Sequence, residues 1–100
     1  MIYVVWEFTV AVENVHTFET AYGGNGTWAE LFHRDSAYHK TILIKDIAQP
    51  RRYMTIDVWE DKEAYLSFKA RFATDYEVID KECESLTASE REIGIFDALA

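Results

Sequence analysis

The first stretch of the chain alternates between apolar and mixed positions, a pattern typical of a β-strand. Every second residue from Ile2 to Val12 is apolar, and the positions between them combine apolar with polar side chains. Neighbouring side chains of a strand point to opposite faces of a sheet, so the two sets lie on different faces. The sequence therefore predicts a first strand over Ile2–Val12, with one fully apolar face and one that is only half apolar.

Two short helical patterns follow this strand. Asn14 is placed to cap a first helix, whose apolar residues recur at helical spacing until Gly23. Thr27 and Glu30 have the spacing of a capping box, which predicts a second helix at the run TWAELF. The glycine-rich segment 23–26 follows a helix and lacks the lysine of a phosphate-binding loop, so we interpret it as a turn.

Two later segments, Tyr38–Asp46 and Tyr53–Glu60, are rich in aromatic and β-branched residues and are predicted to be antiparallel neighbouring strands. The connection between them contains Pro50, a residue typical of turns. Both faces of the second strand include apolar residues. One face carries Met54, Ile56 and Val58, and the other carries Tyr53, Thr55, Asp57 and Trp59.

The last forty residues show helical patterns and then a strand. Asp61 is predicted to cap a helix. The capping box of Thr74 and Glu77 indicates that the helical region restarts there and continues to about Leu86. The polar segment Thr87–Arg91 is interpreted as a turn, and the apolar positions 93, 95 and 99 predict a final strand.

The predicted order is strand, helices, strand, strand, helices, strand, which is the ferredoxin-like βαββαβ arrangement of the α+β class. No linker or change of composition divides the 100 residues, so a single domain over residues 1–100 is expected. Helices are expected to cover one face of the antiparallel sheet. The other face is predicted to carry residues too apolar for water, namely Tyr3, Val5, Leu43, Tyr53 and Trp59. A homodimer that packs sheet against sheet, a dimeric α+β barrel, is therefore expected.

Charge and composition narrow the classes of function. The formal net charge is -8, so no basic stripe is available to bind nucleic acid or an anionic membrane. The N-terminal segment has no signal-peptide features and is too short to span a bilayer, so a cytoplasmic location is expected. The single cysteine, Cys83, fits a reducing compartment. Three histidines without a metal-binding spacing give no support for a metal site.

A family resemblance extends over nearly the whole chain. The segments that carry it are GTWAELF, YHKTILIKD, RRYMTIDVWEDKEAYLSF and IGIFD. They resemble the antibiotic biosynthesis monooxygenase group of the dimeric α+β barrel superfamily, above all in the strand-to-helix pattern Tyr53-x-x-Ile56-x-x-Trp59-x-x-x-x-Ala64-Tyr65-x-x-Phe68. Members of the group include oxygenases of polyketide phenols or quinols that need no cofactor, and enzymes that degrade haem. The resemblance thus implies an oxygenase without a cofactor.

The resemblance transfers to particular residues only in part. Trp59 and Tyr65 match a tryptophan and a tyrosine that, in phenol-oxidising relatives, line the pocket and bind the substrate oxygen. Thr55 stands where those relatives have an asparagine. Haem-degrading relatives use an asparagine on the first strand, near the position of Glu7, and a histidine in the second helical region. That region contains no histidine here, so haem degradation is not expected.

Nine residues are candidates for the site. The predicted substrate-binding residues are Trp28, Phe32, Thr55, Trp59 and Phe68, although the aromatic ones equally suit a dense core. Tyr65 is the predicted hydrogen-bond partner of the substrate oxygen, and Asp57, Glu7 or His39 is the predicted proton acceptor. For Glu7 and Asp57 the favoured interpretation is a plain pairing with Arg52, Lys45 or Lys40. The alternative is a desolvated carboxylate with a raised pKa.

Two hypotheses of function follow. The first is a small oxygenase, without a cofactor, that holds a deprotonated aromatic phenol or quinol in a dry pocket where molecular oxygen reacts with it. The second is a non-catalytic dimeric module that binds a small apolar ligand, or a protein partner, in the same space. No strong catalytic motif decides between them. Turnover of a bound ligand is the property that separates the two classes.

Overall fold

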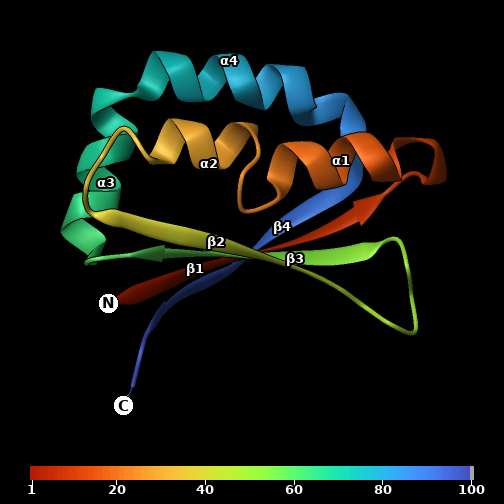
Figure 1. Cartoon of the computed structure of the whole chain (residues 1–100), viewed down its shortest axis with the longest axis horizontal. Coiled ribbons are helices and arrows are strands. Elements are labelled where there is room, and N and C mark those ends of the chain that lie inside the picture. The colour runs from red at the N-terminus through yellow and green to blue at the C-terminus, as the bar shows by residue number, and fades with distance from the viewer. Residues whose placement is uncertain (100) are drawn as a thin grey trace.

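The computed structural model describes residues 1–99 and consists of one four-stranded antiparallel sheet with helices on one of its faces (Figure 1). The elements in chain order are β1 (Ile2–Val10), η1 (Val12–Asn14), α1 (Val15–Tyr22), α2 (Thr27–Phe32), β2 (Tyr38–Lys45), β3 (Arg52–Trp59), α3 (Lys62–Arg71), α4 (Ala73–Cys83), η2 (Glu84–Leu86) and β4 (Thr87–Asp97). The strand order is β2-β3-β1-β4. This order and the α+β composition confirm the predicted ferredoxin-like fold.

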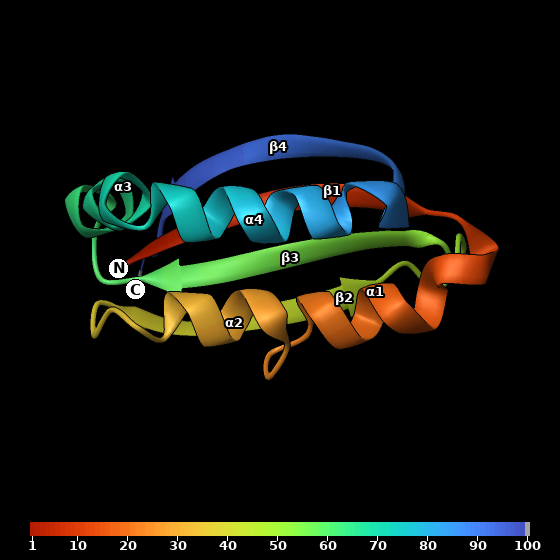
Figure 2. The same ribbon diagram turned by 90° about the horizontal axis from the view of Figure 1, so that it is seen from above.

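The helices form two rows above the sheet. Seen from above, α1 and α2 follow one another along the β2 side, and α4 runs along the β1 side (Figure 2). The helix α3 lies at the end of the sheet where β3 leads into it. The space between the two rows is filled by side chains from the sheet and the helices, so this is where the core and any pocket must lie.

Aromatic side chains dominate the core. Trp59 and Phe68 are fully buried, with ring centroids 5.1 Å apart, and Phe32 packs edge-on against both. At the other end of the sheet Phe18 stacks on Tyr22 at 4.3 Å. Tilted and edge-on ring pairs of this kind stabilise a core beyond the area that they bury.

One prediction about β3 is wrong. The register of β1 and β3 pairs Ile2 with Trp59 and Phe8 with Tyr53, so Tyr53, Thr55, Asp57 and Trp59 face the helices of the same chain. Leu43, on β2, lies opposite Thr55 and faces the helices too. The sequence assigned Tyr53, Asp57, Trp59 and Leu43 to the outer face because both faces of β3 contain apolar residues. Alternation separates the two sets but does not identify which one is covered.

The outer face is nevertheless apolar, and of the five residues predicted for it Tyr3 and Val5 do lie there. It carries Tyr3, Val5, Ile42, Ile44, Met54, Ile56, Val58 and Phe96. Ile44 is 45% exposed and Phe96 is 48% exposed, which leaves large apolar side chains in water on the side of the sheet that the helices do not cover. The reason to expect a partner on this face, the exposure of large apolar side chains to water, therefore still holds for the residues found there.

The strand β4 is longer than predicted. Residues 87–91, interpreted as a turn, pair with the far half of β1. Their polarity reflects an edge strand, where charged side chains also discourage pairing with further strands. The predicted end at Leu99 is too late, because β4 ends at Asp97. A bulge interrupts the pairing near Gly94, which has a positive φ of 156° that favours glycine.

Two of the four predicted cap residues take the N-cap position: Asn14 at α1, without a side-chain hydrogen bond, and Asp61 at α3. Asp61 caps α3 as predicted, since its Oδ1 accepts a hydrogen bond from the backbone N–H of Ala64 at 2.8 Å. Thr27 lies inside α2, and Gly26 takes the capping position. The helix α4 begins at Ala73 with Phe72 in the capping position, so Thr74 lies inside the helix.

Gly26 is required by a close backbone approach. A Cβ at this position would lie 2.3 Å from the carbonyl oxygen of Thr20 and 2.5 Å from that of Ala21. We expect Gly26→Ala to lower the free energy of unfolding by roughly 1–3 kcal/mol, because the turn between α1 and α2 must move apart. Urea denaturation measures this effect. Asn25→Ala, at the exposed neighbouring position, is the control, and equal stability of the two variants would contradict the prediction.

Candidate functional site

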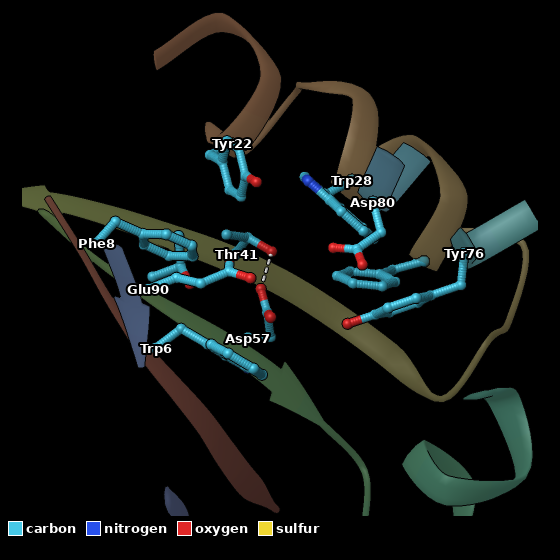
Figure 3. A pocket seen from close by; sticks show the side chains of 11 residues that line it. Trp6, Phe8, Tyr22, Trp28, Thr41, Asp57, Tyr76, Asp80 and Glu90 are labelled. Atoms are coloured by element: carbon cyan, nitrogen blue, oxygen red, sulfur yellow. Dashed lines mark hydrogen bonds between the residues drawn. The ribbon is translucent and has the colours of Figure 1, made fainter. Parts of the chain in front are cut away.

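A pocket opens between the two rows of helices, with the sheet as its floor (Figure 3). Its empty volume is about 480 Å³, counting the part open to solvent. The residues that line it come from every strand and from three helices: Trp6, Phe8, Tyr22, Trp28, Phe32, Thr41, Thr55, Asp57, Tyr76, Asp80 and Glu90. Six of these are aromatic, so the walls are flat, apolar and suited to a ring.

Asp57 is the buried polar group of the floor. It lies on β3 opposite Thr41 of β2, and the Thr41 Oγ1 donates a hydrogen bond of 2.6 Å to its Oδ1. The Tyr38 hydroxyl lies 2.6 Å from the same Thr41 oxygen. A threonine hydroxyl has one proton, which goes to Asp57, so Tyr38 is the donor to Thr41. Two hydroxyls thus orient the carboxylate from one side.

Burial raises the pKa of Asp57 to about 6, although the hydrogen bond from Thr41 acts to lower the pKa. None of the ion pairs among residues 1–99 includes this carboxylate. A carboxylate with a pKa near 6 is a stronger base than an exposed aspartate and is still mostly ionised at pH 7. This combination is what a general base for a weakly acidic hydroxyl needs.

The walls contribute few polar atoms. Burial raises the pKa of Tyr22 and of Tyr76, so both hydroxyls stay protonated at neutral pH. The indole N–H of Trp28 is buried and has no hydrogen-bond partner among the described residues. It lies beside the Tyr22 hydroxyl and the Cys83 sulfur, and its closeness acts to lower the pKa of each of these two groups. The pocket therefore presents donors that a ligand oxygen can engage.

The predicted substrate-binding residues divide into two groups. Trp28, Phe32 and Thr55 line the pocket, together with the candidate base Asp57. Trp59 and Phe68 do not line it. They lie in the core with no exposed surface, and Phe32 contacts both of them.

Tyr65 also lies beside the pocket and not in its wall. Its ring packs on Trp59 with the centroids 5.5 Å apart. Burial raises the pKa of Tyr65 to about 12, and the nearby charge of Asp57 contributes to that shift. The tyrosine is therefore within electrostatic reach of the carboxylate.

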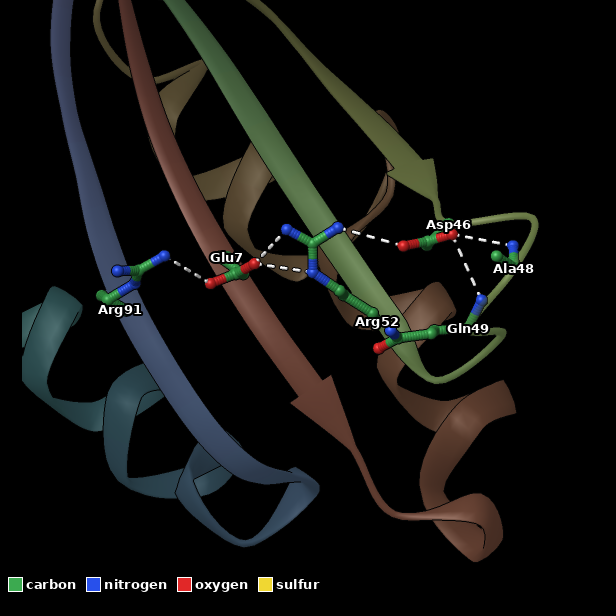
Figure 4. Close-up of polar contacts among 6 residues, drawn as sticks. All are labelled: Glu7, Asp46, Ala48, Gln49, Arg52 and Arg91. Carbon is green, nitrogen blue, oxygen red and sulfur yellow. Dashed lines mark hydrogen bonds and ion pairs between the residues drawn. The ribbon is translucent and has the colours of Figure 1, made fainter.

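The other two candidate bases lie away from the pocket. Glu7 is on the outer face, where Arg52 Nε donates to it at 2.7 Å and Arg91 at 2.9 Å, and these contacts lower its pKa (Figure 4). His39 is exposed and pairs with Glu60 at 3.1 Å. The favoured plain pairing is thus found for Glu7 with Arg52. The predicted pairing with a basic residue is wrong for Asp57, whose side-chain partner is Thr41.

The sequence did not single out several lining residues. Thr41 is not among the predicted site residues, and the pairing of β2 with β3 is what brings it to Asp57. Trp6 and Phe8 fall among the apolar positions of the predicted first strand, and Tyr22 and Tyr76 fall within the predicted helical regions. Their spacing places them on the inner sides of the strand and helices, but it does not distinguish a residue that lines a pocket from one that fills the core.

The described part of the chain shows neither a metal-binding cluster nor a membrane-spanning helix. Among residues 1–99, no group of three or more histidine, cysteine, aspartate or glutamate side chains is placed to hold a metal ion. Within the same range, no helix is both long enough and apolar enough to cross a lipid bilayer.

Solved structures with this fold include antibiotic biosynthesis monooxygenases. SnoaB, a cofactor-independent oxygenase from Streptomyces nogalater, is 20% identical, with a TM-score of 0.75 over 99% of this chain and 93% of that one. A provisionally assigned antibiotic biosynthesis monooxygenase from Bordetella bronchiseptica is 18% identical, with a TM-score of 0.76 over 99% and 97% of the two chains. A similarly assigned protein from Deinococcus radiodurans is 14% identical, with a TM-score of 0.73 over 100% and 94%.

At these identities the comparisons show the fold, and they confirm at that level the resemblance to this group that the sequence indicates. No protein-family model matches the sequence, and no curated protein matches it significantly. The chemistry must therefore be argued from the pocket itself.

The raised pKa of Asp57 predicts how stability depends on pH. Between pH 3.8, the ordinary pKa, and about 6, the folded state holds a proton that the unfolded state has lost, so stability falls as the pH rises. Asp57→Asn removes this cost. We expect the variant to gain up to about 3 kcal/mol over the wild type at pH 7.5, and little at pH 4.

Urea denaturation of both proteins at the two pH values measures the difference, because all other groups titrate alike in each. Asp75→Asn, an exposed carboxylate on α4, is the control and should show no such change. A stability difference between Asp57→Asn and the wild type that is the same at both pH values would contradict the assigned pKa.

Proposed function

We propose that this protein is a monooxygenase that needs no cofactor and oxidises a small aromatic phenol or quinol. The observation that supports it best is the lone buried carboxylate of Asp57, with its raised pKa, at the floor of an aromatic pocket. The fold shared with a cofactor-independent oxygenase is consistent with this chemistry. A base and a dry aromatic site are the two things that such a reaction asks of a protein.

In the proposed reaction the ligand supplies the electrons. Asp57 takes the proton of the phenol, and the resulting phenolate is electron-rich at the ring carbon opposite its oxygen. That carbon reacts with molecular oxygen to form a peroxide, which takes the proton back from Asp57 and becomes a hydroperoxide. Loss of water, with the hydrogen of the same carbon, leaves a carbonyl. One oxygen atom enters the quinone product and the other leaves as water, so phenol and oxygen give quinone and water.

The residues of the pocket walls position the ring of the substrate in this proposal. Trp28 and Phe32 hold the ring flat and exclude water, which keeps the phenolate reactive toward oxygen. Thr55 borders the ring beside Asp57. Trp59 and Phe68 support Phe32 from the core. The Tyr65 hydroxyl, which stays protonated near Asp57, is the proposed hydrogen-bond partner of the substrate oxygen.

One observation favours the second candidate, a non-catalytic module that binds a small ligand. Thr55 stands where the resemblance to phenol oxidisers implies an asparagine, so one polar group of their site is missing. Stabilisation of the fold by an aromatic ligand without any oxygen consumption would favour the module. A ligand at a hundred times its dissociation constant raises stability by about 2.7 kcal/mol.

Oxygen uptake tests the proposed base. With a panel of phenols, naphthols and hydroquinones, we expect uptake that rises with pH through about 6, as Asp57 ionises. Asp57→Asn should lose about 100-fold or more of the rate, because general bases contribute on that scale. Tyr65→Phe should lose less. Labelled molecular oxygen should appear in the quinone formed from any phenol or naphthol that has a hydrogen on the ring carbon opposite its hydroxyl.

The matched controls are Glu7→Gln and His39→Gln, which alter the two candidate bases outside the pocket. Both should keep the wild-type rate. Uptake that survives in Asp57→Asn, or that is lost in either control, would remove Asp57 from the mechanism. The absence of turnover across the whole panel would count against the oxygenase.

We also propose that residues 1–100 act as one cytoplasmic domain that pairs with a second copy through the outer sheet face. The support is the set of large apolar side chains on that face, such as Ile44 and Phe96. An isologous contact buries the same patch on both copies at once.

The assembly is tested with two matched variants. Ile44→Glu places a charge on the outer face, and Ile47→Glu places the same charge in the exposed β2–β3 connection, where Ile47 is fully exposed. Sedimentation at micromolar concentration should give a dimer for the wild type and Ile47→Glu, and a monomer for Ile44→Glu, because a buried unpaired charge opposes the contact. A wild-type monomer would refute the pairing.

A further inference from the structure

A β-bulge in β2 brings two hydroxyl groups to the same face of the sheet. Tyr38 and Thr41 are three residues apart, and side chains at that spacing on a regular strand point to opposite faces. The pairing of β2 with β3 is shifted between Tyr38 and Lys40, which leaves His39 as an extra residue. Tyr38 and Thr41 therefore both face the helices, on the side of the sheet that carries Asp57.

The bulge allows a chain of two hydrogen bonds that ends on Asp57. The Tyr38 hydroxyl lies 2.6 Å from the Thr41 Oγ1, which donates to the Asp57 Oδ1 over the same distance. Burial and the charge of Asp57 both raise the pKa of Tyr38, so the Tyr38 hydroxyl stays protonated and begins the chain as a donor. All three residues are less than a tenth exposed, so little water competes for these bonds.

Packing alone does not explain the two hydroxyls. Phenylalanine and valine have nearly the shapes of tyrosine and threonine, and they would fill positions 38 and 41 without burying a polar group. The hydroxyls are useful because of the carboxylate beside them. The hydrogen bond from Thr41 lowers the pKa of Asp57 against the effect of burial, and Tyr38 strengthens that bond because a hydroxyl that accepts a hydrogen bond donates better.

The chain leaves one oxygen of Asp57 for a ligand. Among residues 1–99, the side chain of Asp57 accepts a single hydrogen bond, and that bond goes to Oδ1. Asp57 and Thr41 line the pocket, whereas Tyr38 does not (Figure 3). A carboxylate held through one oxygen presents the other in a fixed direction, which proton transfer over hydrogen-bond distance requires.

We propose that Thr41 and Tyr38 are positioning residues of the oxygenase, which hold Asp57 through Oδ1 so that Oδ2 takes the proton of the phenol. The inference rests on the proposed function and deepens it, since it assigns the reacting atom of the base. Thr41 acts on the carboxylate directly, and Tyr38 acts through Thr41 by fixing the direction of its hydroxyl proton. Oδ2 later returns the proton to the peroxide, while Oδ1 keeps its hydrogen bond throughout.

Titration of Asp57 in three variants tests the chain. Thr41→Val keeps the shape of the side chain and removes the hydroxyl, Thr41→Ser keeps the hydroxyl, and Tyr38→Phe removes only the first donor. NMR of the carboxyl carbons follows the ionisation of Asp57 in the folded protein. The midpoint should rise from about 6 in the wild type to about 7 or higher in Thr41→Val, because a hydrogen bond to a charged group contributes on that scale. Tyr38→Phe should give a smaller rise, and Thr41→Ser should stay close to the wild type.

Tyr53→Phe is the matched control. Tyr53 is a buried tyrosine on the same face of the sheet, and its hydroxyl donates to Glu19 instead of to the chain. The loss of this hydroxyl should leave the midpoint of Asp57 as it is in the wild type.

Turnover gives a second readout. For the substrate with the fastest oxygen uptake, the pH midpoint of kcat/KM should follow the NMR midpoint in each variant, since both report the free enzyme. At about pH 8.5, where the carboxylate is ionised, Thr41→Val should still lose about tenfold in kcat with little change in KM. The reason is that a misdirected base weakens the transition state more than it weakens substrate binding. Thr41→Ser should recover most of this loss.

The NMR titration needs no turnover, so this inference and the oxygenase can fail separately. Midpoints in the expected order without turnover by any of the proteins would support the hydrogen-bond chain and count against the oxygenase. Turnover together with the same Asp57 midpoint in Thr41→Val and the wild type would overturn the inference and leave the oxygenase. An equal rise in Tyr53→Phe, or a Thr41→Ser variant as impaired as Thr41→Val, would also overturn it, because altered packing would then be the cause.

Discussion

The pairing of β1 with β3 determines which side chains meet beneath the helices. Side chains alternate along a strand, so the one register that sets Ile2 opposite Trp59 also brings Trp6 opposite Thr55 and Val4 opposite Asp57. A shift of a single residue would place Asp57 on the outer face, in water or against a partner, and would remove its raised pKa. The large aromatic residues of the inner face hold this register, because a shift would expose Tyr53 and Trp59 together.

Much of the fold was predictable because its signals are local. The alternation after Ile2, the cap at Asp61 and the stop at Gly23 each depend on a few neighbouring residues, and together they gave the order of elements that the structure has. The failures arose where the answer depends on distant residues. β3 is apolar on both faces, so only its pairing with β1 and its cover of helices reveal that Asp57 is inside. The polar start of β4 looks like a turn because the strand that it joins lies eighty residues away.

The candidate site was less predictable than the fold for a similar reason. Aromatic residues at core spacing were recognised, but spacing alone does not tell which of them border a space. Phe32 and Phe68 contact each other, yet one borders the pocket and the other is sealed behind it. The depth of a side chain between two helical rows depends on the angle and distance of those rows, which no local pattern encodes. Glu7 and Asp57 were equal candidates in the sequence, but they lie on opposite faces of the sheet. Glu7 is paired with arginines on the outer face, whereas Asp57 is buried beneath the helices without a basic partner.

Asp57 also connects the pocket with the outer face of the sheet. Its neighbours in the chain, Ile56 and Val58, point away from the pocket, onto the face proposed to meet a second copy. A buried carboxylate with no basic partner costs stability, so the strand that carries it needs support from other contacts. The aromatic core supplies that support from one side of β3. In the proposed dimer, Ile56 and Val58 would supply it from the other side. The same strand would then hold the base of the reaction rigidly because both of its faces are covered, one by the chain's own helices and one by the partner.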